Sequence, residues 1–106
     1  MAKYLSQAKH TTEGLKGLLK EGGTGRKKAI EKFIASAGGK IESFYYAFGD
    51  TDLFIIFDLP DNVSAAALSL IASAAGTSST KITVLLTPEE IDSATKMTAD
   101  YRPPGK

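Results

Sequence analysis

The chain has 106 residues, with 13 Lys or Arg and 12 Asp or Glu, so its formal net charge is only +1. This length fits one domain, residues 1–106, and a domain this small gains stability by forming oligomers. The near-neutral charge argues against a nucleic-acid partner, because phosphate neutralisation needs many clustered Lys and Arg, and the absence of Cys excludes disulfides and thiolate chemistry.

The N-terminal residues alternate in polarity and do not form the apolar segment of a secretion signal. No apolar run in the sequence is long enough to cross a bilayer. We therefore expect a cytoplasmic protein that does not use a membrane as a partner.

The first third of the sequence predicts a strand followed by an interrupted helix. Residues 3–10 alternate and predict a strand, with Tyr4, Ser6, Ala8 and His10 on one face. Thr11–Glu13 supplies a hydroxyl cap and an acid for the first turn of a helix, and Gly22-Gly23 interrupts it. The second helical piece ends at Gly38-Gly39 and has a buried stripe of Ile30, Phe33, Ile34 and Ala37.

Residues 40–60 predict two strands joined by a tight turn at Gly49–Asp52. Strict alternation in the first strand places Phe44, Tyr46 and Phe48 on one face, and Ile41, Ser43, Tyr45 and Ala47 on the other. The second strand, Leu53–Phe57, is apolar at every position, which is typical of a central strand covered on both sides.

The remaining sequence predicts a helix, a strand and a second, short helix. Pro60-Asp61-Asn62 closes the second strand and caps the first helix. The apolar spacing of this helix predicts a buried face of Val63, Ala66, Ala67, Leu70, Ile71 and Ala74. Lys81–Leu86 forms the strand, with Ile82, Val84 and Leu86 facing one way. Thr87–Glu90 is a capping box with proline at the first helical position, and residues 101–106 form an extended C-terminal arm.

The element order predicts an α+β ferredoxin-like βαββαβ fold, with a four-stranded antiparallel sheet, both main helices on one face and an extra C-terminal helix. The opposite face of such a sheet would lie bare, although the hairpin has apolar side chains on both faces. We therefore expect a homodimer, or a higher homo-oligomer, in which two sheets pack face to face as a dimeric α/β barrel.

Three segments of the chain resemble the GYD-domain family of small bacterial proteins. These are KIESFYYAFGDTD (Lys40–Asp52), DLPD (Asp58–Asp61) and LTPEE (Leu86–Glu90), and the turn Gly49–Asp52 is the most specific of them. Thr51 stands where the family name leads one to expect a tyrosine, so no role of that tyrosine is transferred. The resemblance implies the dimeric α/β-barrel superfamily and supplies no reaction and no cofactor.

His10 is the only histidine and ends the first predicted strand. It is a candidate general base, although we favour a polar strand-end residue. Tyr45 and Tyr46 could each offer a phenol to a cavity, and we favour packing roles for them. Ser6, together with Gln7 and Lys9, predicts either a wet cavity between sheet and helices or a polar seam at the dimer face, and we favour the seam.

Two further segments can each be given a structural or a functional interpretation. Asp50 and Asp52 could bind a hard cation or act as an acid/base pair, but we favour turn formation because Asp caps nearby amides. Residues 22–28 combine glycines, a helix start and three cations and could bind an anion, yet they lack the spacing of a nucleotide-binding loop, so we favour a solvated helix junction. One histidine and no cysteine argue against a transition-metal site within one chain, although two subunits could contribute to one jointly.

Two functions remain open at the level of the sequence. The leading hypothesis is a homodimeric binding module that holds a small organic ligand between sheet and helices, with Ser6, His10 and Tyr46 as candidate ligand-binding residues. The alternative is a cofactor-free enzyme, an isomerase or a monooxygenase-like protein, that uses His10 as base with Tyr45 or Tyr46 orienting the substrate. Fold analogy alone supports this alternative.

Overall fold

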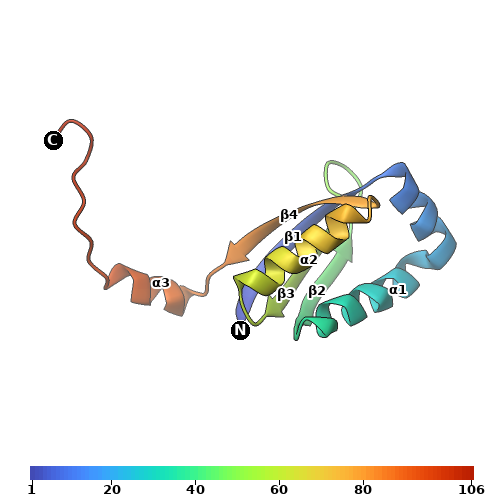
Figure 1. The fold of residues 1–106 in the computed structure, drawn as a ribbon, viewed down its shortest axis with the longest axis horizontal. Helices are drawn as coiled ribbons and strands as arrows, with labels where there is room; N and C mark the ends of the chain where they lie inside the picture. The colour runs from blue at the N-terminus through green and yellow to red at the C-terminus, as the bar shows by residue number, and fades with distance from the viewer.

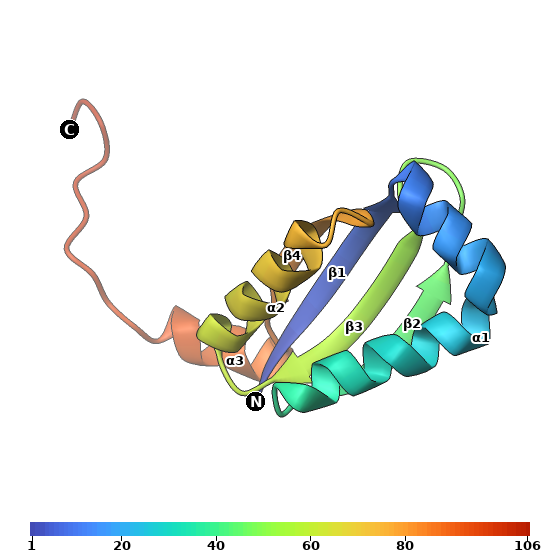
Figure 2. The same cartoon turned by 45° about the vertical axis from the view of Figure 1, so that its right-hand side comes forward.

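The computed structural model describes residues 1–106, and its elements follow the predicted order (Figure 1). They are β1 (Ala2–His10), α1 (Thr12–Ser36), β2 (Lys40–Tyr46), β3 (Leu53–Leu59), α2 (Asn62–Ala74), β4 (Ser78–Leu85) and α3 (Pro88–Thr95). The strands form one antiparallel sheet in the order β2-β3-β1-β4. Figure 2 shows α1 and α2 on the same side of this sheet. The predicted ferredoxin-like fold is confirmed.

The core lies between the sheet and the two main helices. Alternate residues of β1 and β3 point toward the helices, as the period of a strand requires. The buried apolar residues are Tyr4, Ala8, Leu53, Ile55, Phe57, Leu59, Ile34 of α1, and Ala65 and Leu68 of α2. Tyr4 stacks on Phe57 with 5.8 Å between ring centroids. Its hydroxyl donates a 2.6 Å hydrogen bond to Asn62 Oδ1, which ties β1 to the start of α2.

Helix α1 is divided by a kink at Gly22, where φ is +79° and ψ is 164°. This left-handed backbone favours glycine, so the predicted interruption is confirmed. The segment after the kink buries Ile34 and packs Ile30, Phe33 and Ala37 against the core, as predicted. The segment before it covers less, since Leu15 and Leu19 are exposed.

The predicted alternation of β2 was wrong at Ile41. The register slips between Ile41 and Ser43, where a bulge leaves Glu42 without a partner on β3. Ile41 pairs with Phe57 and Phe44 pairs with Ile55, so both side chains lie on the helix side of the sheet. Phe48 lies beyond the strand and is 99 % exposed, so it does not share the face of Phe44.

The predicted buried face of α2 was also wrong. The residues that pack on the sheet are Ala65 and Leu68, whereas Leu70 is 72 % exposed and Val63 78 % exposed. Ile71 is exposed as well, although part of its surface lines the cleft described below. Most positions around α2 are apolar, and the polar residues Ser64 and Ser69 lie on its half-buried side. The apolar spacing therefore predicted that the side of α2 exposed in the structure would be buried. The Tyr4 to Asn62 hydrogen bond, a long-range contact, helps to set the rotation of the helix.

Strand β4 begins at Ser78, three residues earlier than predicted, and ends at Leu85. Ile82 lies opposite Ser6 and Val84 lies opposite Tyr4, so both side chains face the helices. The prediction that these two residues share one face is confirmed. Leu86 lies outside the strand and does not continue that face.

The sheet face opposite the helices is uncovered in the single chain. Tyr45 is 71 % exposed and Phe54 is 37 % exposed on this face, where they pair across β2 and β3. The half-buried residues Leu5, Ile56 and Leu85 continue the apolar surface onto β1, β3 and β4. We call these five residues the open-face patch.

Helix α3 and the residues after it extend away from the body of the protein (Figures 1 and 2). The predicted capping box is confirmed: Glu90 N donates to Thr87 Oγ1 at 3.1 Å, and Thr87 N donates to Glu90 Oε1 at 2.9 Å. This C-terminal segment exposes Leu86, Ile91, Met97 and Tyr101. No helix in the structure combines the length and the hydrophobicity that crossing a membrane demands.

Candidate functional site

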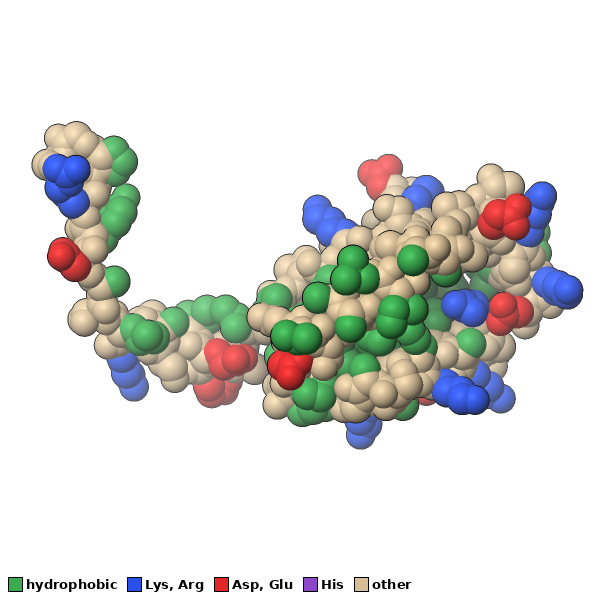
Figure 3. Space-filling model, in the orientation of Figure 1, with side chains coloured by type: hydrophobic (Ala, Val, Ile, Leu, Met, Phe, Trp, Pro, Cys, Tyr) green, Lys and Arg blue, Asp and Glu red, His purple; other side chains and the backbone are tan.

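A cleft of about 300 Å³ lies between α1 and α2 on the helix side of the sheet. It exists because α1 packs chiefly on β2 and α2 chiefly on β4, so residues of the two central strands form the floor between them. Of its 19 lining residues, 13 are hydrophobic. Figure 3 shows hydrophobic side chains gathered over α2 and between α2 and α1.

Ser6 lies on the floor of the cleft and is the only buried polar residue of the chain. The alternation of β1 places Gln7 on the opposite face, where it pairs with Phe54 and Lys81. Near the end of β1, Lys9 Nζ donates hydrogen bonds to Gly49 O and to Asp52 Oδ1. The three polar residues are therefore divided between the cleft, the open face and a loop contact, and do not form one polar group.

His10 lies in a second, smaller pocket of about 130 Å³ at the end of β1. This pocket adjoins the cleft, since Ala8, Arg26, Ile30, Leu53, Thr77 and Ser78 line both. The side chain of His10 is only 10 % exposed, and its Nδ1 is buried without a hydrogen-bond partner. Nδ1 lies 3.6 Å from Asp52 Oδ2, longer than a hydrogen bond but close enough for a direct ion pair when the ring is protonated.

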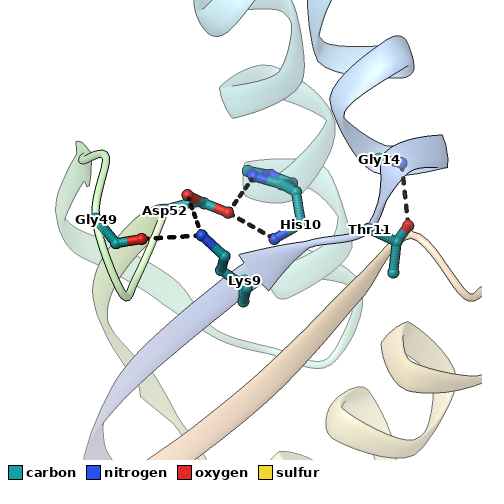
Figure 4. Close-up of polar contacts among 6 residues, drawn as sticks. All are labelled: Lys9, His10, Thr11, Gly14, Gly49 and Asp52. Atoms are coloured by element: carbon teal, nitrogen blue, oxygen red, sulfur yellow. Dashed lines mark hydrogen bonds and ion pairs between the residues drawn. The ribbon is translucent and has the colours of Figure 1, made fainter.

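Asp52 fixes the loop between β2 and β3 to the end of β1 (Figure 4). Its Oδ2 accepts a 2.8 Å hydrogen bond from the backbone N of His10, and its own backbone N donates to Ala8 O. The His10 amide and the Lys9 ammonium stabilise the carboxylate and hold the pKa of Asp52 below its ordinary value. Asp52 thus accepts a hydrogen bond from a backbone amide of β1, and not from an amide of its own turn as predicted. Asp50 is exposed.

Neither candidate tyrosine lines the cleft or the smaller pocket. Tyr46 donates a 2.8 Å hydrogen bond to Gly23 O beside the kink of α1, and its ring meets Phe44 edge-on at 5.2 Å. Burial raises the pKa of Tyr46. Tyr45 belongs to the open-face patch on the other side of the sheet. Tyr46 therefore has packing surroundings, whereas Tyr45 is left exposed in the single chain.

Arg26 is a site residue that the sequence did not single out from its neighbours. Of the three cations in residues 22–28, Arg26 alone lines the cleft, and it lines the smaller pocket too. Lys27 and Lys28 are exposed, and Lys27 Nζ lies 5.9 Å from the ring centroid of Phe44. The kink at Gly22 turns the second helical segment toward the sheet, a consequence that the run of glycines and cations alone does not reveal.

The proximity of His10 and Asp52 was also missed, although the predicted topology contained the signal. In a ferredoxin-like sheet the first and third strands are antiparallel neighbours, so the end of one lies beside the start of the other. The observed pairing of Ala8 with Leu53 places His10 next to the residues that precede β3. No group of three or more His, Cys, Asp or Glu side chains lies close enough together to hold a metal ion.

The sheet order and the cleft define a ferredoxin-like α+β domain with one predominantly apolar cleft between its main helices. The chain matches the family model described as GYD domain over residues 4–95. It belongs to the GYD-domain family, as the turn and strand motifs predicted. No match was found among curated proteins or among solved structures.

Proposed function

We propose that this GYD domain is a binding module that holds a small organic molecule in the cleft between α1 and α2. The observation that carries the proposal is the cleft itself, whose volume of about 300 Å³ lies at the lower end of the range for ligand sites, about 300–1,000 Å³. Its lining is mostly apolar with a few hydroxyls and one cation, the composition typical of such sites. Ser6 supplies a hydroxyl at its floor.

The test is a fragment screen by NMR chemical-shift perturbation, combined with a variant that fills the cleft. Ala72→Phe introduces a ring into the cleft from α2, and the matched variant Ala66→Phe places the same ring on the exposed side of that helix. Bound fragments should shift the amides of Ser6, Ile55 and Ala72. We expect binding to disappear in Ala72→Phe and to persist in Ala66→Phe, with both variants folded by circular dichroism.

Two results would contradict the binding module. One is a screen in which no fragment produces saturable shifts of the cleft residues. The other is binding that survives in Ala72→Phe unchanged, which would locate the bound fragments elsewhere on the surface.

The proposed partners are this ligand and a second copy of the chain. Dimerisation through the open-face patch would cover Tyr45 and Phe54, which are exposed in the single chain. The helix-side cleft would stay accessible, because it lies on the other side of the sheet.

A second candidate function, a cofactor-free isomerase-type enzyme, has one specific observation in its favour. His10 is held nine-tenths buried in a pocket that adjoins the cleft, with a carboxylate near its Nδ1. A carboxylate in that position can orient an imidazole, and an oriented imidazole suits a general base. Neither tyrosine lines the pocket, so this candidate depends on His10 with Asp52 as a positioning residue.

The enzyme candidate is tested by proton exchange. Small 1,3-dicarbonyl compounds are incubated with the protein in deuterated water, and loss of the α-proton signal is followed by NMR. An enzyme should accelerate exchange over buffer, and His10→Gln should remove the acceleration while leaving the melting temperature close to that of the wild type. Exchange at the buffer rate, or equal exchange by wild type and His10→Gln, would contradict the enzyme hypothesis. Neither result would bear on the binding-module hypothesis.

A further inference from the structure

We infer that the cleft is selective for an apolar organic monocarboxylate, whose carboxylate is bound by Arg26. The inference rests on the proposed function, because it names the class of ligand for the same cleft. It is carried by the distribution of charge over the cleft and the smaller pocket.

Arg26 is the only charged residue among the 19 that line the cleft. The other polar lining residues are serines and threonines, and the remainder are hydrophobic. A neutral apolar ligand would need no cation there, and burying the guanidinium under such a ligand would cost free energy. A single cation at the edge of an apolar surface matches a ligand with one anionic group and a hydrophobic remainder.

The guanidinium of Arg26 has N–H groups available to donate hydrogen bonds to a ligand. Its one ion-pair partner is Glu21, at 3.8 Å, and both side chains are more than 40 % exposed, at 42 % and 43 %. Exposed pairs of this kind contribute little, so a ligand carboxylate can displace Glu21 at small cost. The planar fork of Arg matches a carboxylate with two parallel hydrogen bonds, and this geometry favours carboxylate over a simple point charge.

An independent observation places a polar end at the same position. Arg26 is shared with the smaller pocket, which His10 also lines. Only four of the 12 residues lining that pocket are hydrophobic, against 13 of 19 in the cleft. The joined hollow therefore runs from an apolar part over β3 and β4 to a polar part at Arg26 and His10. Glu13 and Glu21 also line the polar part. Their charge opposes any anion there, and a dianion most strongly, so we expect the ligand carboxylate on the cleft side of Arg26.

The experiment compares two probes of nearly equal shape, 2-naphthoate and 2-naphthylmethanol, titrated into the 106-residue protein. Binding is measured by calorimetry or by the fluorescence of the naphthyl ring, since the chain has no tryptophan. Wild type should bind the acid about tenfold or more tighter than the alcohol, the effect of a charge-assisted hydrogen-bond pair. Arg26→Gln should weaken the acid to the level of the alcohol and leave the alcohol unchanged. Lys28→Gln removes the same charge from an exposed position two residues on and should preserve the preference.

Arg26→Lys separates charge from geometry, since it keeps the cation and loses the planar fork. We expect it to retain only part of the preference for the acid, and thermal melts should show that all three variants fold. Equal affinity of wild type for acid and alcohol overturns the inference while the proposed binding function stands. An unchanged preference in Arg26→Gln also overturns it. Absence of saturable binding of both probes overturns the inference, and the fragment screen then decides whether the proposed function stands.

Discussion

Asp52 is the residue through which the loop between β2 and β3 is attached to the rest of the sheet. Its backbone joins Ala8 and Ala47, and its carboxylate joins Lys9 and His10. One side chain thus determines both the path of the loop and the surroundings of the imidazole. Because the imidazole ends β1 and the carboxylate lies just before β3, the pocket at His10 depends on the correct pairing of β1 with β3.

Asp52→Asn should reduce the dependence of stability on acid pH. The folded protein holds the pKa of Asp52 below its ordinary value of 3.8, so the ionised carboxylate stabilises the fold above that value. This contribution is lost as the pH falls through the lower, folded pKa. We expect wild type to lose more stability than Asp52→Asn in urea titrations between about pH 5 and about pH 2. Asp50→Asn, at an exposed position, is the control and should follow wild type.

Ile55→Ala and Leu59→Ala should both destabilise the fold, within the range of about 2–5 kcal/mol for such core truncations. Leu59 is fully buried and outside the cleft lining, so its truncation leaves a closed cavity and should fall toward the upper end. Ile55 borders the cleft, which only becomes larger, so its cost should fall toward the lower end. Denaturant titration measures both. A cost below about 1 kcal/mol for Ile55→Ala would contradict its place in the core.

At the scale of elements, α1 consists of two segments with different roles. The segment after Gly22 packs on the core, whereas the segment before it begins against the turn that precedes β4. Thr11 N donates to Thr77 O at 3.0 Å, and Thr11 Oγ1 donates to Gly76 O at 2.9 Å. This junction encloses the pocket of His10, because Gly14, Gly17 and Thr77 line it.

Gly14→Ala and Gly17→Ala should change stability in opposite directions. A Cβ on Gly14 would overlap the carbonyl of Thr77, so the backbone must move, at a cost of about 1–3 kcal/mol. A Cβ on Gly17 would meet no atom within 4 Å, so the higher helix propensity of alanine should stabilise by up to about 1 kcal/mol. Thermal and urea unfolding compare the pair. Equal effects of the two substitutions would contradict the close approach of α1 to Thr77.

The whole molecule has two faces with different surroundings. The helix face contains the core and the cleft, while the open-face patch leaves five apolar side chains of the sheet without cover in a single chain. Uncovered apolar surface of this kind is characteristic of interaction sites. We expect the patch to be the contact between two copies.

The dimer prediction is tested by light scattering at micromolar concentration, which should report at least twice the mass of one chain. Phe54→Lys places a charge in the middle of the open-face patch and should shift the protein to monomer. Leu70→Lys places the same charge on the exposed side of α2 and should leave the dimer intact. A stable wild-type monomer would contradict the prediction.

Features set by short stretches of sequence could be predicted, and features set by long-range contacts could not. Gly22 and the Thr87 to Glu90 box act within a few residues, so the kink and the last helix were foreseen. The rotation of α2 could not be, because its sequence is apolar on both sides and its orientation depends on distant contacts such as that of Tyr4 with Asn62. Ile41 was misplaced because a bulge shifts the alternation of β2.

The candidate site was predictable only in outline. A polar Ser6 on a central strand left a cavity and a dimer seam both open, and the seam was favoured, whereas Ser6 lies in the cleft on the helix side. His10 was a candidate because it is the only histidine. Its carboxylate neighbour Asp52 and the cation Arg26 emerged only from strand pairing and from the direction of α1 after the kink.

The separation of α3 from the body has a consequence for how the sequence can evolve. Residues of β1 and β3 must satisfy neighbours on the helix side of the sheet, so a change at one position constrains the others. Helix α3 has no extensive packing against any other element, yet Ile91, Met97 and Tyr101 expose large apolar side chains around it. Substitutions of these exposed residues would remove few contacts within the chain, so we expect the fold to tolerate them and the sequence of this segment to vary with little cost in stability.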